Sequence, residues 1–326
     1  MDPLADVLDL SRVSGALMAN VRARAPWGLD IPQGPGASFH AVTSGVAWLR
    51  QADGDPIQLM PGDVVLLPSA AAHRISSEPD GPCVPFDRIV KQQLIGPDGE
   101  LELGGTGAGT TFVCAGYDYD LDVAGRLLGV LPPLIHVAAD PFHERDVGAI
   151  VALLASEVGA TSAGSRAAAA RLIDLLLIAA IRSWSRRDGR PSWLTALHDP
   201  LVARALALLH ERPADPWTLE GLAREVHVSR ATLARRFTDA VGEPPLAYLA
   251  RWRMDLAARR LRTSTDSVET IADEVGYASP YAFNRAFARY RGEPPGRYRR
   301  VRSAADPRPS PSAARSRTAR RSRAGA

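Results

Sequence analysis

Residues 229–248, SRATLARRFTDAVGEPPLAY, return 50 residues later as SPYAFNRAFARYRGEPPGRY at 279–298. Both segments begin with serine, have phenylalanine at the ninth position and close with Gly-Glu-Pro-Pro ahead of a tyrosine. A second matched pair precedes them, LEGLAREV at 219–226 and VETIADEV at 268–275, at an offset of 49 residues. The second copy therefore has one extra residue between its two segments, and two copies of one structural unit lie in series.

Each copy has the pattern of two helices joined by a short turn. The apolar residues of each leading segment follow the 3.6-residue period of a helix. Thr218 and Ser229 stand where the two N-caps of the first copy are expected, and Asp266 or Ser267, then Ser279, stand there in the second. These proportions predict two helix-turn-helix units.

The segment between the copies, residues 246–261, is amphipathic, with Trp252 and Leu256 on its apolar side. Its positive charges are Arg251, Arg253, Arg259, Arg260 and the adjoining Arg262. A helix of this length spans about 24 Å. It can hold two recognition helices roughly 34 Å apart, which is one turn of DNA. We therefore expect one chain to read two adjacent major-groove segments.

The second helix of each unit has an outward polar face. If Leu233 and Phe237 point inward, arginines share the opposite side, and Arg235 and Arg285 occupy equivalent positions of the two copies. An arginine in the major groove can give a bidentate pair to guanine, and Asn284 can do the same for adenine. An ordinary solvated face of arginines is the alternative interpretation.

The candidate DNA-binding residues are Arg230, Arg235, Arg236, Ser279, Tyr281, Asn284, Arg285 and Arg289. The proposed base readers are Arg230, Arg235, Asn284 and Arg285, and the candidate phosphate contacts are Arg236, Arg289, Arg297 and Arg299.

A family resemblance is carried by Trp217-Thr218-Leu219, Ser229, Phe237, Gly242-Glu243-Pro244-Pro245, Tyr248-Leu249, Trp252-Arg253-Met254, Ile271-Ala272, Val275-Gly276-Tyr277 and Phe283-Asn284-Arg285-Ala286-Phe287. Together these residues resemble the DNA-binding domain of AraC/XylS-type transcription regulators, which has two half-motifs, a linker helix and a closing Gly-x-x-Pro in both. The resemblance implies that Arg235 and Arg285 are base readers. Pro280-Tyr281 departs from the family pattern, where small or acidic residues are commoner, so the base sequence read there stays open.

The net charge of +3 conceals a division of the chain. Residues 1–199 carry 15 basic and 23 acidic side chains, a net charge of −8, whereas residues 200–326 carry 24 and 13, a net charge of +11. Only the second part would attract a polyanion such as DNA. Because Lys91 is the only lysine, nearly all of this positive charge is guanidinium, which suits bidentate contacts to phosphate and guanine.

The N-terminal part contains short apolar or alternating runs cut by Gly, Pro and Asp. They are 38–42, 46–49, 57–59, 64–68 and 73–75, continued by 89–95, 99–103 and 111–114. This pattern predicts an antiparallel sandwich or barrel. Residues 4–23, in contrast, have a rough apolar stripe and are predicted to form a first helix.

Two stretches of this part resemble cupin barrels. Residues 61–68, PGDVVLLP, with His73 after them are similar to the second cupin motif, and Phe39-His40 with Gly45 takes the place of the first. AraC-type regulators with a cupin-like N-terminal domain form a recognisable group, and the resemblance then covers most of the chain.

His40 and His73 have three open interpretations. They could bind a divalent metal with Cys114 as a third ligand, line a ligand pocket together with Trp48, or be hydrogen-bonded core residues. Metal-dependent cupin enzymes use a His-x-His pair and a nearby Glu in the first motif, and neither follows His40. The sequence indicates no cofactor beyond this metal option.

Two helices are predicted after the barrel, at 147–158 and 166–184. The second is apolar on nearly all sides in its middle turns, so it must be buried, either against the barrel or across a dimer. The family resemblance favours the dimer.

The cellular setting follows from what the sequence contains. Cys83 and Cys114 form no disulfide framework, the N-terminus lacks a secretion signal, and the longest apolar run, 175–181, is too short for a membrane span of about 20 residues. We expect a cytoplasmic protein.

We therefore predict an α+β protein with a cupin-like β-barrel and helical pair, followed by an all-α domain with two helix-turn-helix motifs joined by a linker helix. The predicted parts are a sensing and dimerisation domain at 1–185, a linker at 186–199, the DNA-binding domain at 200–302 and a disordered Arg-rich tail at 303–326.

The predicted function is sequence-specific regulation of transcription, not catalysis, under control of a small ligand or metal at the barrel. Expected partners are operator DNA, RNA polymerase, a small-molecule effector and a second copy of the chain, and no membrane. Two alternatives stay open: a metal-dependent cupin enzyme with an accessory DNA-binding domain, and an architectural DNA protein without sequence preference.

Overall fold

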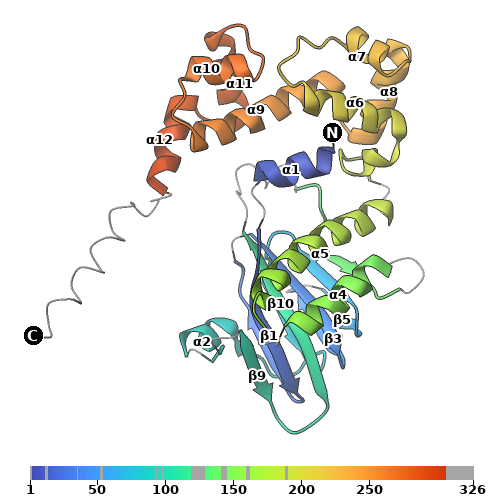
Figure 1. Cartoon of the computed structure of the whole chain (residues 1–326), viewed down its shortest axis with the longest axis vertical. Coiled ribbons are helices and arrows are strands. Elements are labelled where there is room, and N and C mark those ends of the chain that lie inside the picture. The colour runs from blue at the N-terminus through green and yellow to red at the C-terminus, as the bar shows by residue number, and fades with distance from the viewer. Residues whose placement is uncertain are drawn as a thin grey trace, which may run out of the picture.

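The computed structural model describes residues 2–305 apart from 12–13, 35, 52–53, 93, 97–98, 119–128, 141–144, 159–161 and 188–189. An N-terminal part with two β-sheets is followed by an all-helical part, and Figure 1 shows the two at opposite ends of the molecule. The predicted α+β class is confirmed.

Two mixed sheets face each other. The first has the order β11-β6-β3-β10-β1-β9 and the second β5-β4-β7-β2-β8. Neighbours are antiparallel except for the pairs β1–β9 and β2–β8. The strands are β1 (Ser14–Arg24), β2 (Gly28–Ile31), β3 (Ala37–Ser44), β4 (Ala47–Gln51), β5 (Ile57–Leu59), β6 (Val64–Leu67), β7 (His73–Ser76), β8 (Val84–Pro85), β9 (Glu100–Gly104), β10 (Gly109–Asp118) and β11 (Ile135–Val137).

The first sheet is buried on both faces, which explains its continuous apolar runs. Along β6, Val65 and Leu67 belong to the core between the sheets, whereas Val64 and Leu66 belong to a second core on the outer face. Helices α4 (Arg145–Glu157) and α5 (Ser165–Arg187) cover that outer face (Figure 1).

The prediction of one helix over residues 4–23 is wrong in its second half. Helix α1 (Pro3–Ser11) ends early, and β1 follows with Ala19 opposite Cys114 of β10. Tertiary pairing with β10 overrides a local apolar stripe that fits a helix as well as a strand.

The strand predicted at 89–95 is also wrong. Residues Phe86–Lys91 form helix α2, and Phe86 and Ile89, one turn apart, both enter the core between the sheets. A spacing of three residues places side chains on one face of a helix but on opposite faces of a strand.

The C-terminal part has the predicted double arrangement. Its elements are a short 3-10 helix (Thr195–His198), α6 (Pro200–Glu211), α7 (Leu219–Glu225), α8 (Arg230–Val241), α9 (Pro245–Thr263), α10 (Val268–Glu274), α11 (Pro280–Arg291) and α12 (Pro295–Ala305). Thr218, Ser229, Ser267 and Ser279 accept N-cap hydrogen bonds from backbone N–H groups, as predicted. Apart from the end of α12, the predicted tail lies outside the described residues.

Helix α1 joins the two parts. Its buried residues Leu4, Val7 and Leu10 share one apolar core with α6 and α9, and the chain then enters the barrel as β1 (Figure 1). The core on the outer face of the first sheet therefore continues into the helical part.

Tyr117 ties α5 to the first sheet. Its hydroxyl, on a residue only 1% exposed, donates to the carbonyl of Ile173 at 2.6 Å, and burial raises the pKa of Tyr117 well above its usual value.

We expect Tyr117→Phe to lower the free energy of unfolding by about 1 kcal/mol, because one buried hydrogen bond is lost. Urea titration measures this difference. Tyr281→Phe, at a hydroxyl-bearing side chain that is 71% exposed, is the control, and equal losses in both variants would contradict the assignment.

Candidate nucleic-acid interface

The first recognition helix, α8, exposes arginines on one face because its large apolar residues are buried on the other. Leu233 and Phe237 are buried, whereas Arg230 and Arg235 are exposed. Arg230 lies 3.8 Å from Glu220 across the turn, and both side chains remain largely exposed. Within the described part of the chain, the guanidinium of Arg235 has no hydrogen-bond or ion-pair partner.

Arg236 differs from its neighbour. Its Nε and Nη2 donate to Oδ2 of Asp199 at 3.2 and 2.7 Å, and Asp199 also caps α6. Although burial alone would raise it, the pKa of Asp199 is lowered, because Arg236 and the N–H groups of Val202 and Leu201 stabilise the carboxylate. Arg236 therefore fastens α8 to α6, and this competes with the phosphate contact predicted for it.

The second recognition helix, α11, repeats the arrangement with different chemistry. Arg285 is exposed and lies over the ring of Tyr281, with 5.8 Å from its Cζ to the ring centroid. Nδ2 of Asn284 donates to the carbonyl of Pro280 at 2.8 Å. Arg289 lies over Tyr290, and Ser279 caps the helix. A base contact by Asn284 Nδ2 would therefore replace a bond within the helix.

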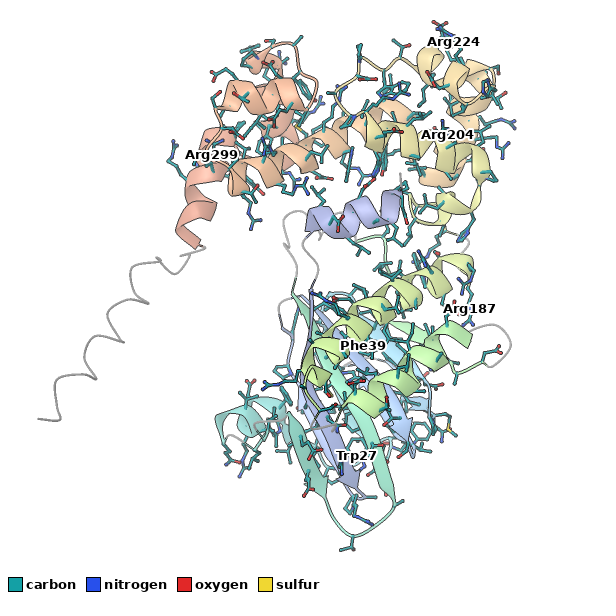
Figure 2. The ribbon with its side chains drawn as sticks, in the orientation of Figure 1. Trp27, Phe39, Arg187, Arg204, Arg224 and Arg299 are labelled. Carbon is teal, nitrogen blue, oxygen red and sulfur yellow. The ribbon has the colours of Figure 1, made fainter. Side chains whose placement is uncertain are left out.

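The two candidate phosphate contacts of α12 separate. Arg297 is largely exposed and 3.5 Å from Glu293, whereas Arg299 donates from Nη2 to the carbonyl of Asp266 at 2.6 Å. Arg299 thus holds the loop before α10. Figure 2 shows Arg299 and Arg224 at opposite ends of the helical part, and Arg224, exposed on α7, is a basic side chain that sequence analysis did not single out.

Helix α9 is the element that both units share. Figure 1 shows it running from the α7–α8 pair to the α10–α11 pair. Its 19 residues span about 28 Å. The recognition helices therefore sit at its two ends, as the predicted reading of adjacent grooves requires.

The predicted metal residues lie together in the barrel but form a line. Nδ1 of His40 is 3.1 Å from Sγ of Cys114, and Nε2 of His40 is 2.7 Å from Nε2 of His73. Nδ1 of His73 is 2.7 Å from the carbonyl of Ala71. Neutral groups satisfy every contact: Cys114 donates to His40, His40 to His73, and His73 to the carbonyl.

The protonation of this line is set by burial. Burial and, second, the neighbouring His73 hold the pKa of His40 well below its usual value, and burial also lowers that of His73. Burial raises the pKa of the Cys114 thiol. Because the ring nitrogens bond to each other instead of converging on one point, these residues do not fit a metal ion, and the described residues hold no group of three His, Cys, Asp or Glu suited to one.

The predicted ligand set is not brought together. Ala47 and Leu49 of β4 point into the core between the sheets, so Trp48 points to the opposite face, away from His40 and His73.

Each helix in the described part of the chain is too short or too polar to span a membrane.

A buried histidine links α1 to the helical part. Nδ1 of His210 is 3.2 Å from Oδ2 of Asp6, its Nε2 is 2.7 Å from the hydroxyl of Tyr248, and its ring stacks on Trp252 at 4.0 Å. Burial lowers the pKa of His210, opposed by Asp6 and assisted by the charge of Arg251. The neutral ring, donating to Asp6 and accepting from Tyr248, satisfies both contacts.

This lowered pKa makes stability depend on pH. The pKa of a histidine in an unfolded chain is about 6.5. Below that pH the unfolded chain binds a proton at His210, whereas the folded chain, in which this pKa is lower, does not. The free energy of unfolding therefore falls as the pH falls. We expect the free energy of unfolding to decrease more steeply for the wild type than for His210→Gln between about pH 7.5 and about pH 5.5, measured by urea titration at fixed ionic strength. Parallel pH profiles would contradict this, since the other histidines are common to both proteins.

Comparison with known proteins identifies both parts of the chain. Residues 2–186 match a family described as cupin, and residues 222–301 match one described as helix-turn-helix domain. An AraC-like transcription regulator of Streptomyces lividans is 36% identical over 304 residues, 92% of this chain and 98% of that protein. The HTH-type transcriptional regulator AlkR of Acinetobacter baylyi is 31% identical over 304 residues, 92% and 99% of the two chains. The DNA-binding domain of the transcriptional factor AdpA, solved with a target DNA, is 34% identical and covers 33% of this chain and 97% of its own, with a TM-score of 0.32. The full-length matches show that the chain belongs to the AraC family of transcription regulators, with a cupin domain ahead of its helix-turn-helix DNA-binding domain.

Proposed function

We propose that this regulator binds a specific operator sequence, with α8 and α11 of one chain entering two successive segments of the major groove. The observation that carries the proposal is the pair of exposed arginines, Arg235 and Arg285, at equivalent positions of helices at the two ends of α9. The positive charge of residues 200–326 supports it, because phosphate attraction supplies much of the affinity for DNA.

We propose a role for each side chain on the basis of its surroundings. Arg235, which nothing in the described protein holds, is the first guanine reader, and Arg285 is the second, with Tyr281 beside it as an aromatic surface. Asn284 reads adenine after leaving the carbonyl of Pro280. The remaining exposed candidates are Arg230 as a base reader, and Arg289 and Arg297 as phosphate contacts.

Replacing either guanine reader should relax specificity at one base pair. We expect Arg235→Ala and Arg285→Ala each to cost about 1 to 3 kcal/mol of discrimination, because a bidentate pair is lost. Selection of sites from a random DNA pool, followed by competition binding at fixed salt, measures this. Arg204→Ala, an exposed arginine of α6, is the control and should leave the base preference unchanged. Unaltered preference in both variants would show that another surface faces DNA.

No observation favours either of the two alternative functions, a metal-dependent enzyme or an architectural DNA protein. A metal-dependent enzyme would need converging donors, whereas the His40 contacts form a line, and the relatives are named as regulators. An architectural protein would bind selected and random DNA with similar affinity, which the same competition experiment measures.

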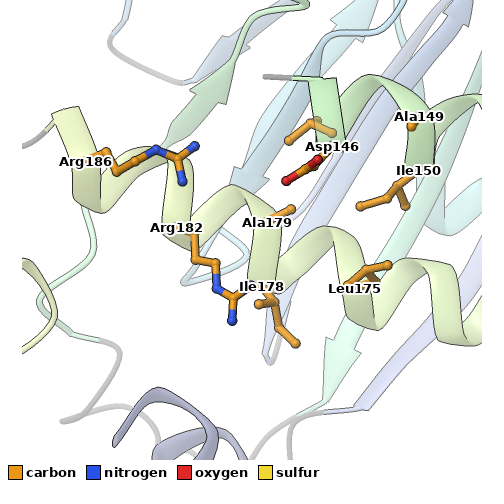
Figure 3. A pocket seen from close by; sticks show the side chains of 9 residues that line it. Asp146, Ala149, Ile150, Leu175, Ile178, Ala179, Arg182 and Arg186 are labelled. Carbon is orange, nitrogen blue, oxygen red and sulfur yellow. The ribbon is translucent and has the colours of Figure 1, made fainter. Parts of the chain in front are cut away.

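We also propose that two chains associate through α4 and α5. A groove of about 310 Å³ lies between these helices, with Ile150, Leu175 and Ile178 along it and Arg182 toward one end (Figure 3). Leu175 is 45% exposed, although the opposite side of α5 is buried against the sheet. Leu153, 56% exposed, lies one turn along α4 from Ala149, which also lines the groove. Two exposed leucines on adjoining helices favour a contact surface, and a two-fold dimer would use it on both partners.

Leu175→Arg should weaken this association. The guanidinium would have to lose its water of hydration in the dimer but stays solvated in the monomer. Sedimentation velocity should show a dimer for the wild type and a shift of at least about tenfold in the dissociation constant for the variant. Val90→Lys, at a comparably exposed apolar residue of α2, should not change it. A monomeric wild type, or equal dissociation constants, would rule out this surface.

The remaining partners are proposed from the family and from the expected function. An effector bound by the N-terminal part would act on the DNA-binding part through α1, whose apolar residues are buried with α6 and α9. Contact with RNA polymerase would convert DNA binding into regulation. A cytoplasmic location is proposed because the chromosome is there.

A further inference from the structure

The turn of the second helix-turn-helix unit touches the loop that leads into the first unit, in addition to the connection through α9. Gly276, in the turn of the second unit, has a φ of +80°, and a Cβ there would lie 2.4 Å from the carbonyl oxygen of Ala214. Ala214 lies in the loop between α6 and α7, ahead of the first unit. Only glycine permits this approach of the two backbones.

Arg253 of α9 binds both sides of this contact. Its Nε donates to the carbonyl of Pro213 at 2.6 Å and its Nη2 to that of Asp215 at 2.7 Å. Its Nη1 donates to the carbonyl of Gly276 at 3.3 Å, and its Cζ lies 5.9 Å from the ring centroid of Tyr277. The planar guanidinium therefore connects the loop before α7, helix α9 and the turn before α11.

The loop that Arg253 holds is itself fixed. The indole N–H of Trp217 donates to the carbonyl of Arg212 at 2.9 Å, and the guanidinium of Arg212 lies 4.8 Å from the centroid of that ring. On the other side, Tyr277 packs edge-on against Phe283 of α11 at 5.7 Å. Arg253 thus joins two segments that are each held by further contacts, and each segment leads to one unit.

The two copies of the repeat differ at this place. The turn of the second copy contains the extra residue of the 50-residue offset and supplies Gly276 and Tyr277. In the first copy the matching turn position is His227, which is exposed and has a φ of +57°. The asymmetry of the repeat therefore coincides with the contact between the units.

We propose that Arg253 is a positioning residue that sets the separation and angle of α8 and α11, so that the regulator selects two half-sites by their spacing as well as by their bases. This inference rests on the proposed binding of adjacent groove segments. Adding one base pair between half-sites moves the second by about 3.4 Å and rotates it by about 34° about the DNA axis. A rigid pair of units cannot follow that change, whereas two units hinged on α9 could follow part of it.

The experiment uses the full-length chain and duplexes built from the site recovered by selection, with the native spacing and with two base pairs inserted. For the wild type we expect the insertion to weaken binding by at least about 30-fold, because one recognition helix loses its base contacts. For Arg253→Met we expect about tenfold weaker binding to the native spacing, because the loosened units must be ordered on the DNA, and a penalty of only about threefold for the insertion.

Two further variants isolate the contact. Gly276→Ala forces the same backbones apart and should give the same loss of spacing selectivity. Arg251→Met removes an equal charge from the same helix, but Arg251 contacts Glu243 and Tyr248 on the first unit only, so the wild-type penalty should be kept. Circular dichroism of each variant establishes that the helices are formed.

The salt dependence separates positioning from a phosphate contact. A positioning residue leaves the slope of log K against log salt unchanged, whereas loss of one phosphate contact reduces the slope by about one unit, and Arg253→Lys would then restore binding. An unchanged spacing penalty in Arg253→Met, or a reduced slope restored by lysine, would overturn the inference. A wild type without any preference for the selected site would instead overturn the proposed function itself.

Discussion

The hydrogen bonds of the Arg253 guanidinium are the interaction on which the DNA-binding part depends, because they join the loop that leads into the first unit to the turn inside the second. A helix such as α9 fixes the distance between its ends but not how each attached unit rotates. Three hydrogen bonds and a backbone contact at Gly276 remove that freedom. Burial lowers the pKa of Arg253, yet the side chain stays cationic, and three backbone carbonyls, the ring of Tyr277 and the charge of Asp215 stabilise this half-buried charge.

The barrel keeps histidines at the two positions of the cupin motifs, but these histidines bond to each other. His40 and His73 still point into the space between the sheets, but the space is filled by apolar side chains and by Cys114, and the imidazoles satisfy each other. Asp63, in the turn of the second cupin motif, has become a structural residue: its carboxylate accepts from the N–H groups of Met60 and Ala139 and contacts His136. The outer face of the first sheet supports α4 and α5.

The two parts are connected by a shared core and not by a polar linker alone. Helix α1 inserts its apolar side beside α6 and α9, and Asp6 meets His210 there. The next element along the chain is β1, the strand beside β10 in the first sheet. The N-terminal segment therefore contributes to both parts, with α1 packed in the helical part and β1 in the first sheet.

Sequence by itself determined the C-terminal architecture, because helix periodicity, N-caps and the duplicated Gly-Glu-Pro-Pro are local signals repeated twice. It also placed Arg235 and Arg285 on exposed faces, since Leu233 and Phe237 leave only one side free. Tertiary structure alone decided what lies beside each polar group. Residues 14–24 form a strand because they pair with β10, and Trp48 points away from the histidines. Arg236 is bonded to Asp199, and Arg253 is half-buried between the two units. These outcomes depend on residues tens of positions apart, up to 104 for Ser14 and Asp118, and no local period or spacing encodes which of several equivalent arginines will meet a carbonyl, a carboxylate or solvent.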